Sequence, residues 1–174
     1  QSMLILYPAG RTAESYTIPD SVTSIGDFSG CASLTSIVIP ASVIDIDYMA
    51  FGNCASLATI TVDGANPSFS SLDGVLFNKD QSTLIRYPDG KTADSYTIPT
   101  SVTSIGQYAF RDCTSLTSLS IPDSVTSIGD SAFQDCTSLV SIEIPSSVTS
   151  IGSAFEGCTH LDRVYFEGNA PELR

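Results

Sequence analysis

Short stretches of alternating apolar and polar residues recur along the chain. In the stretch Leu-x-x-Ile-x-Ile the last two apolar side chains stand two residues apart, which is the period of a β-strand with one buried face. Ile-Pro closes the stretch at residues 98–99, 121–122 and 144–145, at intervals of 23 residues. Proline ends a strand because it offers no N–H to the ladder. The five copies of the stretch are Leu34/Ile37/Ile39, Leu57/Ile60/Val62, Leu116/Leu119/Ile121, Leu139/Ile142/Ile144 and Leu161/Val164/Phe166.

Each copy has a second short apolar element, Val-x-x-Ile, of which Val102/Ile105 is typical. Glycine follows this element at positions 26, 106, 129 and 152, where we expect a turn with positive φ; Asp47 fills the same place once. Ala109, Phe110 and Cys113 then have near-helical spacing, which predicts a short helical turn. No unit can bury its apolar side alone, so neighbouring units must stack into a solenoid.

The regular period is interrupted between Val62 and Ile98, which are 36 residues apart. Apolar runs at 75–77 and 84–87 flank a polar, turn-forming segment and predict a β-hairpin. Residues 2–19 match residues 82–99 at 13 of 18 positions. We therefore expect one solenoid over residues 1–174, taken from a longer array. Its expected parts are regular coils at about 17–62 and 97–167, a hairpin-type insertion at about 63–97, and a partial copy of that insertion at 1–16.

Composition narrows the class of partner. Ser and Thr supply 45 of the 174 residues, and charged residues only 15%. The 19 acids and 7 bases give a net charge of −12, which disfavours binding to nucleic acid or to anionic membranes. No apolar run approaches the roughly 18 residues of a membrane-spanning helix, so we expect no membrane insertion.

The repeated pattern Ile-Pro-x-Ser-Val-x-x-Ile-Gly-x-x-Ala-Phe-x-x-Cys-x-Ser-Leu-x-x-Ile resembles the BspA-type leucine-rich repeat, the 23-residue class of bacterial surface proteins. The match covers residues 17–62 and 97–167. The resemblance implies an α/β-type, strand-rich repeat solenoid: a right-handed coil with a parallel β-sheet, short opposite strands and short helical turns. It also implies a secreted or cell-surface protein used in adhesion, with a host matrix or other cell-surface protein as the partner.

The residues whose side chains could act in catalysis or bind a metal have structural explanations. The five cysteines, Cys31, Cys54, Cys113, Cys136 and Cys158, all occupy the same place in their coils, which favours a column of buried free thiols over a zinc site. His160 follows Cys158 closely but fills a turn position that is serine in the other coils. Asp45 and Asp47 lack the spacing of a calcium loop. We expect no enzyme, no cofactor and no metal.

The outward-facing positions of the sheet distinguish two possible functions, recognition of a partner and service as a structural spacer. Most are small and polar, as suits a structural spacer that presents other domains away from the cell surface. Arg and aromatic side chains are typical binding anchors. The candidate partner-binding residues are Glu143, Arg163 and Tyr165 on the sheet, with Lys79 and Asp80 on the hairpin.

Overall fold

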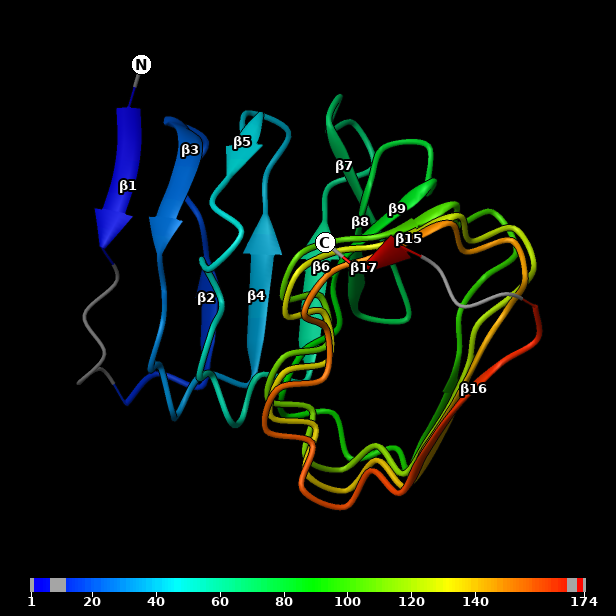
Figure 1. Cartoon of the computed structure of the whole chain (residues 1–174). Coiled ribbons are helices and arrows are strands. Elements are labelled where there is room, and N and C mark those ends of the chain that lie inside the picture. Colours follow the sequence, from blue (N-terminus) through cyan, green and yellow to red (C-terminus); the bar gives the residue numbers. More distant parts are fainter. Residues whose placement is uncertain (1, 7–11, 169–171, 174) are drawn as a thin grey trace.

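The computed structural model describes residues 2–6, 12–168 and 172–173, and within these ranges every regular element is a β-strand. The chain winds into stacked coils (Figure 1). We call residues 12–62 the N-terminal stack, 63–97 the insertion and 98–168 the C-terminal stack. In Figure 1 the N-terminal stack is seen from its side and the C-terminal stack nearly along its stacking direction, so the direction changes at the insertion.

The strands form two lines around the coils. The first line consists of β2 (Ser15–Thr17), β4 (Ser36–Ile39), β6 (Thr59–Val62), β10 (Ser95–Thr97), β12 (Ser118–Ser120), β14 (Ser141–Ile144) and β16 (Arg163–Phe166). The second consists of β1 (Ser2–Leu6), β3 (Val22–Asp27), β5 (Asp45–Ile46), β9 (Thr83–Arg86), β11 (Ser104–Ile105), β13 (Ser127–Ile128), β15 (Ser150–Ile151) and β17 (Glu172–Leu173). The insertion adds β7 (Phe69–Leu72) and β8 (Val75–Asn78) to the second line.

Pairing between successive coils is parallel throughout, which confirms the predicted solenoid of parallel coils. The first line is divided into three ladders, β2-β4-β6, β10-β12 and β14-β16, rather than the single sheet that five equal stretches predict. The insertion stands between β6 and β10 along the chain. In the second line, one seven-stranded sheet runs β17-β15-β13-β11-β9-β8-β7, and only the β7–β8 and β8–β9 pairs are antiparallel.

The predicted helical turn is wrong, because residues 107–112 form a series of tight turns. The N–H groups of Tyr108, Phe110 and Asp112 donate to carbonyls of the next coil, at 3.2, 2.8 and 2.9 Å. The alternate N–H groups, such as that of Arg111 to the Tyr108 carbonyl (3.1 Å), bond back within the turn. A helix needs every N–H for its own i−4 carbonyl. Tyr108 (φ 56°) and Asp112 (φ 62°) are also left-handed, which breaks any helix. The α/β label therefore does not hold for the described residues.

The glycine that follows the second strand of each coil in the C-terminal stack allows close stacking of the coils. The positive φ predicted for these glycines is wrong. None of Gly106, Gly129 and Gly152 has a positive φ. A Cβ on Gly129 would lie 2.7 Å from the Gln107 nitrogen, and one on Gly152 would lie 2.8 Å from the Asp130 Cα. Because these neighbours belong to the adjoining coil, a side chain here would force the coils apart.

The insertion joins two separate hydrophobic cores. On β8, Val75 and Phe77 pack into the core of the C-terminal stack, whereas Leu76, between them, packs into the core of the N-terminal stack. On β9, Leu84 and Ile85 divide between the cores in the same way. Alternate residues of a strand face opposite sides, so this strand pair is covered on both faces.

A buried ion pair within the insertion also connects the two stacks. Arg86 is paired with Asp89, and the two residues are 3% and 6% exposed. The Arg86 guanidinium donates to the carbonyls of Phe51 (3.2 Å) and Tyr108 (2.7 Å), one in each stack. The Asp89 carboxylate accepts the N–H of Cys54 at 3.0 Å. The pair therefore supplies hydrogen bonds to both stacks where the repeat itself is interrupted.

Gly90→Ala should destabilise the protein strongly. A Cβ on Gly90 would lie 2.3 Å from the Ser56 carbonyl carbon and 2.6 Å from the Leu57 nitrogen, both backbone atoms of the N-terminal stack. We expect urea unfolding to show a loss of about 2–3 kcal/mol in the free energy of unfolding. Gly64→Ala is the control, since a Cβ there meets nothing within 4 Å. Equal effects of the two substitutions would contradict the close approach of Gly90 to the backbone of the N-terminal stack.

Asp89→Asn should leave the Arg86 guanidinium buried without a counter-ion. We expect the free energy of unfolding to fall by about 3–5 kcal/mol, measured by the same urea titration. Asp63→Asn is a matched control, because Asp63 is exposed and asparagine can still accept the Ala65 N–H (2.8 Å). A loss for Asp89→Asn no larger than for the control would show that the pair is not needed.

Candidate functional site

The three predicted sheet residues come together on the β14–β16 ladder, and we call Glu143, Arg163 and Tyr165 the Arg163 cluster. Glu143 is directly opposite Tyr165 in the parallel register. The Arg163 guanidinium donates to the Tyr165 hydroxyl at 3.1 Å and forms an ion pair with Asp162 at 3.2 Å. The Arg163 side chain is 66% exposed and Tyr165 is 49% exposed. The cluster thus presents a guanidinium, a phenol and a carboxylate to solvent.

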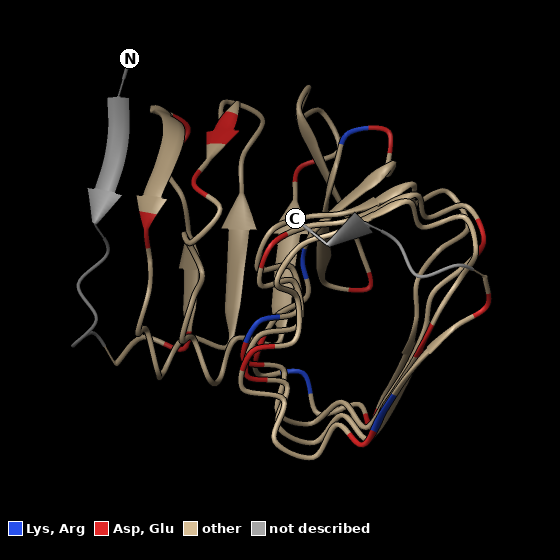
Figure 2. Ribbon diagram, in the orientation of Figure 1, with Lys and Arg blue, Asp and Glu red and all other residues tan. Residues whose placement is uncertain are grey.

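The two predicted hairpin residues lie elsewhere. Lys79 and Asp80 are in the turn between β8 and β9, which belongs to the second line of strands. Figure 2 shows this charged turn at the upper end of the hairpin, away from the basic group at the start of β16. Lys79 donates to the Gly64 carbonyl (3.0 Å), and Asp80 accepts from the Ser82 hydroxyl and N–H, which lower its pKa. The five residues therefore do not form one site.

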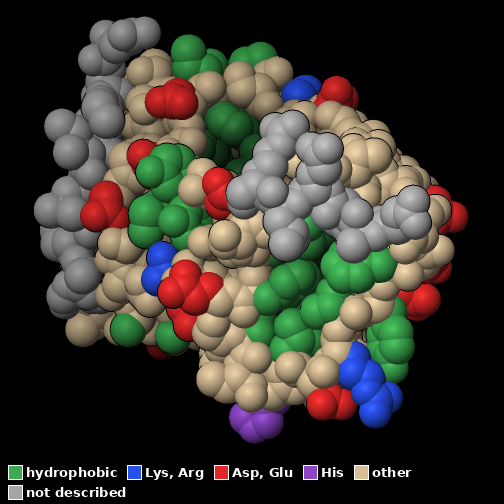
Figure 3. Space-filling model, viewed as in Figure 1, with side chains coloured by type: hydrophobic (Ala, Val, Ile, Leu, Met, Phe, Trp, Pro, Cys, Tyr) green, Lys and Arg blue, Asp and Glu red, His purple; other side chains and the backbone are tan. Residues whose placement is uncertain are grey.

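An exposed apolar surface lies on both sides of β5 along the chain, and sequence analysis missed it. Ile44, Tyr48 and Met49, which we call the Tyr48 patch, are 52%, 56% and 39% exposed. In Figure 3 hydrophobic side chains gather over the loop after β5, with acidic groups around them and a basic group at the lower edge. The signal lay in the sequence, because this coil reads Ser-Val-Ile-Asp-Ile-Asp where four others read Ser-Val-Thr-Ser-Ile-Gly.

Two tyrosines stack across the insertion at the edge of this patch. The rings of Tyr48 and Tyr108 have centroids 5.8 Å apart and an interplanar angle of 15°. The Arg111 guanidinium lies 5.5 Å from the Tyr108 ring centroid and is paired with Asp112. This pair of rings joins a coil of the N-terminal stack to a coil of the C-terminal stack. Both stacks therefore support the patch.

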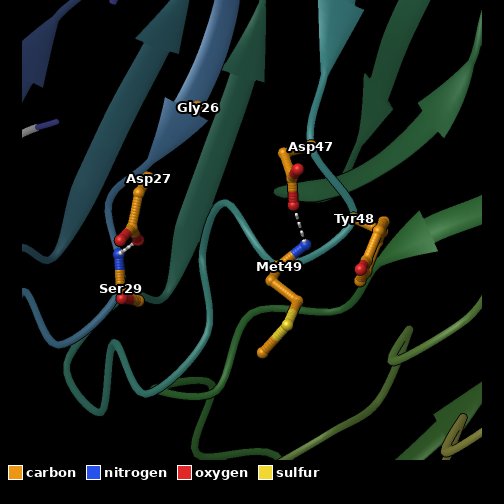
Figure 4. A pocket seen from close by; sticks show the side chains of 6 residues that line it. All are labelled: Gly26, Asp27, Ser29, Asp47, Tyr48 and Met49. Carbon is orange, nitrogen blue, oxygen red and sulfur yellow. Dashed lines mark hydrogen bonds between the residues drawn. The ribbon is translucent and has the colours of Figure 1, made fainter. Parts of the chain in front are cut away.

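A cavity of about 370 Å³ opens beside the patch. Figure 4 shows Asp27 and Ser29 on one side and Asp47, Tyr48 and Met49 on the other. Each carboxylate accepts the N–H two residues on, Asp27 from Ser29 (2.7 Å) and Asp47 from Met49 (2.8 Å). The hydroxyl and N–H of Ser29 lower the pKa of Asp27. The cavity lies at the coil where aspartate replaces the stacking glycine.

The cysteines form a column of hydrogen-bonded thiols. All five are free, and four are buried, whereas Cys158 is half-buried; the prediction of five buried thiols is wrong for that one. The thiols of Cys54, Cys136 and Cys158 donate to the carbonyls of Phe28, Phe110 and Phe133 at 3.1, 3.0 and 2.9 Å. Burial raises the pKa of Cys54 to about 12. These thiols link neighbouring coils and are poor nucleophiles.

None of the residues that the structure describes forms a catalytic arrangement with the histidine. His160 is exposed, and its Nδ1 lies 2.6 Å from the Thr137 carbonyl, whereas the Cys158 thiol is bonded to Phe133. Asp45 accepts from the Ser24 hydroxyl at 2.8 Å. Among the described residues no three His, Cys, Asp or Glu side chains group as metal ligands. A search of the same residues for a long apolar helix of membrane-spanning length finds none.

Stacked parallel coils with a thiol column and a variable outer sheet define a leucine-rich-repeat solenoid, a scaffold type that generally mediates protein interactions. The chain belongs to the family of the BspA type leucine rich repeat region, whose model matches six copies over residues 9–90 and 88–173. The resemblance seen in the sequence is thereby confirmed. No curated protein matches the chain.

Solved bacterial proteins share this architecture. A leucine-rich repeat protein from Eubacterium ventriosum is 32% identical, with a TM-score of 0.84 over 91% of this chain and 42% of its own. One from Bacteroides ovatus is 29% identical, with a TM-score of 0.52 over 87% of this chain and 45% of its own. The pneumococcal vaccine antigen PcpA, at 20% identity and a TM-score of 0.58 over 90% of this chain and 57% of its own, shares the fold. The chain spans about half the length of these proteins.

Stability should fall at high pH because of the thiol column. The folded-state pKa of Cys54, about 12, exceeds its ordinary value of 9.0, so its contribution is complete below pH 9 and is lost between pH 9 and pH 12. Tyr87 and Tyr96, also raised to about 12 from 10.0, add a loss only above pH 10. We expect the free energy of unfolding, measured by urea titration, to fall from pH 9. Cys54→Ala should make that fall shallower without moving its onset, because Cys31, Cys136 and Cys158, whose pKa values the fold also raises, still contribute to it. An unchanged slope of the free energy of unfolding between pH 9 and pH 12 in the variant would contradict this assignment.

Proposed function

We propose that this protein is a non-enzymatic recognition and adhesion module of a bacterial cell-surface or secreted leucine-rich repeat protein. The observation that carries the proposal is the Arg163 cluster. Its arginine and tyrosine occupy two outward positions that are filled by Thr59 and Thr61 in the N-terminal stack and by Ser118 and Ser120 in the C-terminal stack. Positions that repeat cannot encode a particular partner, whereas these differ in size and charge.

The chemistry of the cluster suits a protein partner. Arginine and tyrosine are enriched among the residues that dominate binding energy, since each combines a large apolar contact with directed hydrogen bonds. The hydrogen bond from Arg163 to Tyr165 holds the two side chains together before binding, which lowers the entropy lost on association. Glu143 beside them adds a charge of opposite sign, so the cluster can discriminate by charge.

The proposed partner is a host matrix protein or another cell-surface protein. Membership of the BspA-type family supports this choice, as it does the cell-surface or secreted location. The net charge of −12 argues against a nucleic acid as partner. Lys79 and Asp80 on the β8–β9 turn are a separate proposed contact, because their turn lies in the other line of strands.

A structural spacer is the second candidate function. The exposed positions of the middle coils favour it, since Ser118, Ser120 and Ser141 are small, polar and without anchors. Such a surface keeps a solenoid soluble and selects no partner. In this reading Tyr165 covers the edge of the apolar core beside Val164, which is half-buried and packs against it.

The double variant Arg163→Ala/Tyr165→Ala should weaken binding to a partner at least tenfold, since each of the two anchor side chains costs more than about 1 kcal/mol when it is lost and tenfold corresponds to about 1.4 kcal/mol. Binding is measured by biolayer interferometry with the full chain over a panel of immobilised mammalian extracellular matrix proteins. Thr59→Ala/Thr61→Ala changes the same two positions of another coil and should leave affinity unchanged. Melting temperatures establish that each variant is folded.

Two results would count against recognition through this cluster. Equal weakening by both double variants would remove the Arg163 cluster from the interface. Absence of binding to every matrix protein by the folded wild-type chain would favour the spacer.

A further inference from the structure

The Tyr48 patch departs from the repeat where stacking does not require it. Ile44 replaces a threonine, Asp45 a serine and Asp47 a glycine relative to the coil of Val102. The inward residues of this coil, Val43, Ala50 and Cys54, keep the repeat and are buried. The changes are therefore confined to the outer surface, where they add one apolar and two acidic groups that the core does not use.

The patch combines exposed apolar side chains with a cavity flanked by carboxylates. Tyr48 and Met49 form one wall of the 370 Å³ cavity, and Asp27 stands on the other. Each aspartate uses its Oδ1 for the backbone N–H, and asparagine could make the same bond. The carboxylate charges are therefore dispensable for the two turns.

The electrostatic surroundings select a cationic partner. Residues 12–78 contain seven Asp or Glu and no Lys, Arg or His. On the other side of the insertion, Arg111 is paired with Asp112 and lies on the Tyr108 ring. A second copy of this chain would bring the same negative charge to the patch, so charge disfavours self-association.

We propose that the Tyr48 patch is a second docking surface, which takes a partner-protein segment with Lys or Arg flanking apolar side chains. The basic side chain enters the cavity between Asp27 and Asp47, and the apolar side chains lie against Ile44, Tyr48 and Met49. This inference rests on the proposed recognition function and assigns it a surface distinct from the Arg163 cluster. The Tyr48–Tyr108 stack fixes one edge of the surface before binding, which lowers the ordering cost.

The test is a ¹⁵N NMR titration of the full chain with the peptide Gly-Lys-Leu-Phe-Lys-Gly. We expect saturable shifts at the amides of residues 27–29 and 44–49. Gly-Lys-Ser-Ser-Lys-Gly, which keeps the charge without the apolar side chains, and Gly-Glu-Leu-Phe-Glu-Gly should each bind at least tenfold more weakly. A tenfold ratio corresponds to a loss of about 1.4 kcal/mol for each class of contact.

Matched variants separate a site from general attraction to an acidic protein. Asp27→Asn/Asp47→Asn keeps both turns and should weaken the Lys-Leu-Phe-Lys peptide roughly tenfold, as should Tyr48→Ser. Asp20→Asn/Asp123→Asn removes the same charge from exposed positions outside the patch and should change affinity less than twofold. Equal weakening by the two aspartate pairs, or equal binding of the serine peptide, would overturn the proposal.

The location of the response distinguishes this inference from the proposed function. Shifts confined to residues 141–166 would refute the Tyr48 patch and leave the Arg163 cluster standing. Concentration-dependent dimerisation that Tyr48→Ser abolishes, measured by sedimentation, would assign the patch to a second copy and also refute the proposal. Shifts localised at residues 44–49 when the peptide is added to the Arg163→Ala/Tyr165→Ala variant would support the docking surface at the Tyr48 patch. That conclusion would hold even if the variant binds matrix proteins normally, a result that would count only against the Arg163 cluster.

Discussion

The structure depends on backbone hydrogen bonds that run from each coil to the next. Because every second N–H in the turn at 107–112 is committed to the neighbouring coil, the local chain has no bonds left for a helix. The same closeness excludes side chains at Gly129 and Gly152 and brings the thiol of Cys136 within reach of the Phe110 carbonyl. The tight turns, the recurring glycines and the recurring buried cysteines thus all result from the short distance between neighbouring coils.

The sequence predicts what repeats, and is less informative about what the repetition brings into contact. The 23-residue interval is enough to predict parallel coils, and the shared place of Cys54 and Cys136 is enough to predict buried thiols. The spacing of Ala109, Phe110 and Cys113 fits a helical turn and a series of tight turns equally well, since both bury the three side chains. Only the neighbouring coil decides between them, and its distance is not encoded in any one repeat.

The candidate surfaces show the same division. Glu143, Arg163 and Tyr165 could be placed on one ladder from the strand period alone. That Lys79 and Asp80 lie on the other line of strands follows from the β8–β9 pairing, which the sequence does not orient. The Tyr48 patch lies outside the outward sheet positions that the strand period marks, and its contact with Tyr108 exists only because the insertion brings distant coils together.

The strand pair β8–β9, with one face in each core, makes the insertion the point of thermodynamic coupling in the molecule. In an ordinary repeat array each unit interacts only with its neighbours, so the ends can fray while the middle persists. Here, release of Leu76 and Phe77 would expose both cores at once. The cooperative unit of unfolding therefore extends through the insertion, and the irregular segment of the sequence becomes the part that makes two stacks behave as one body.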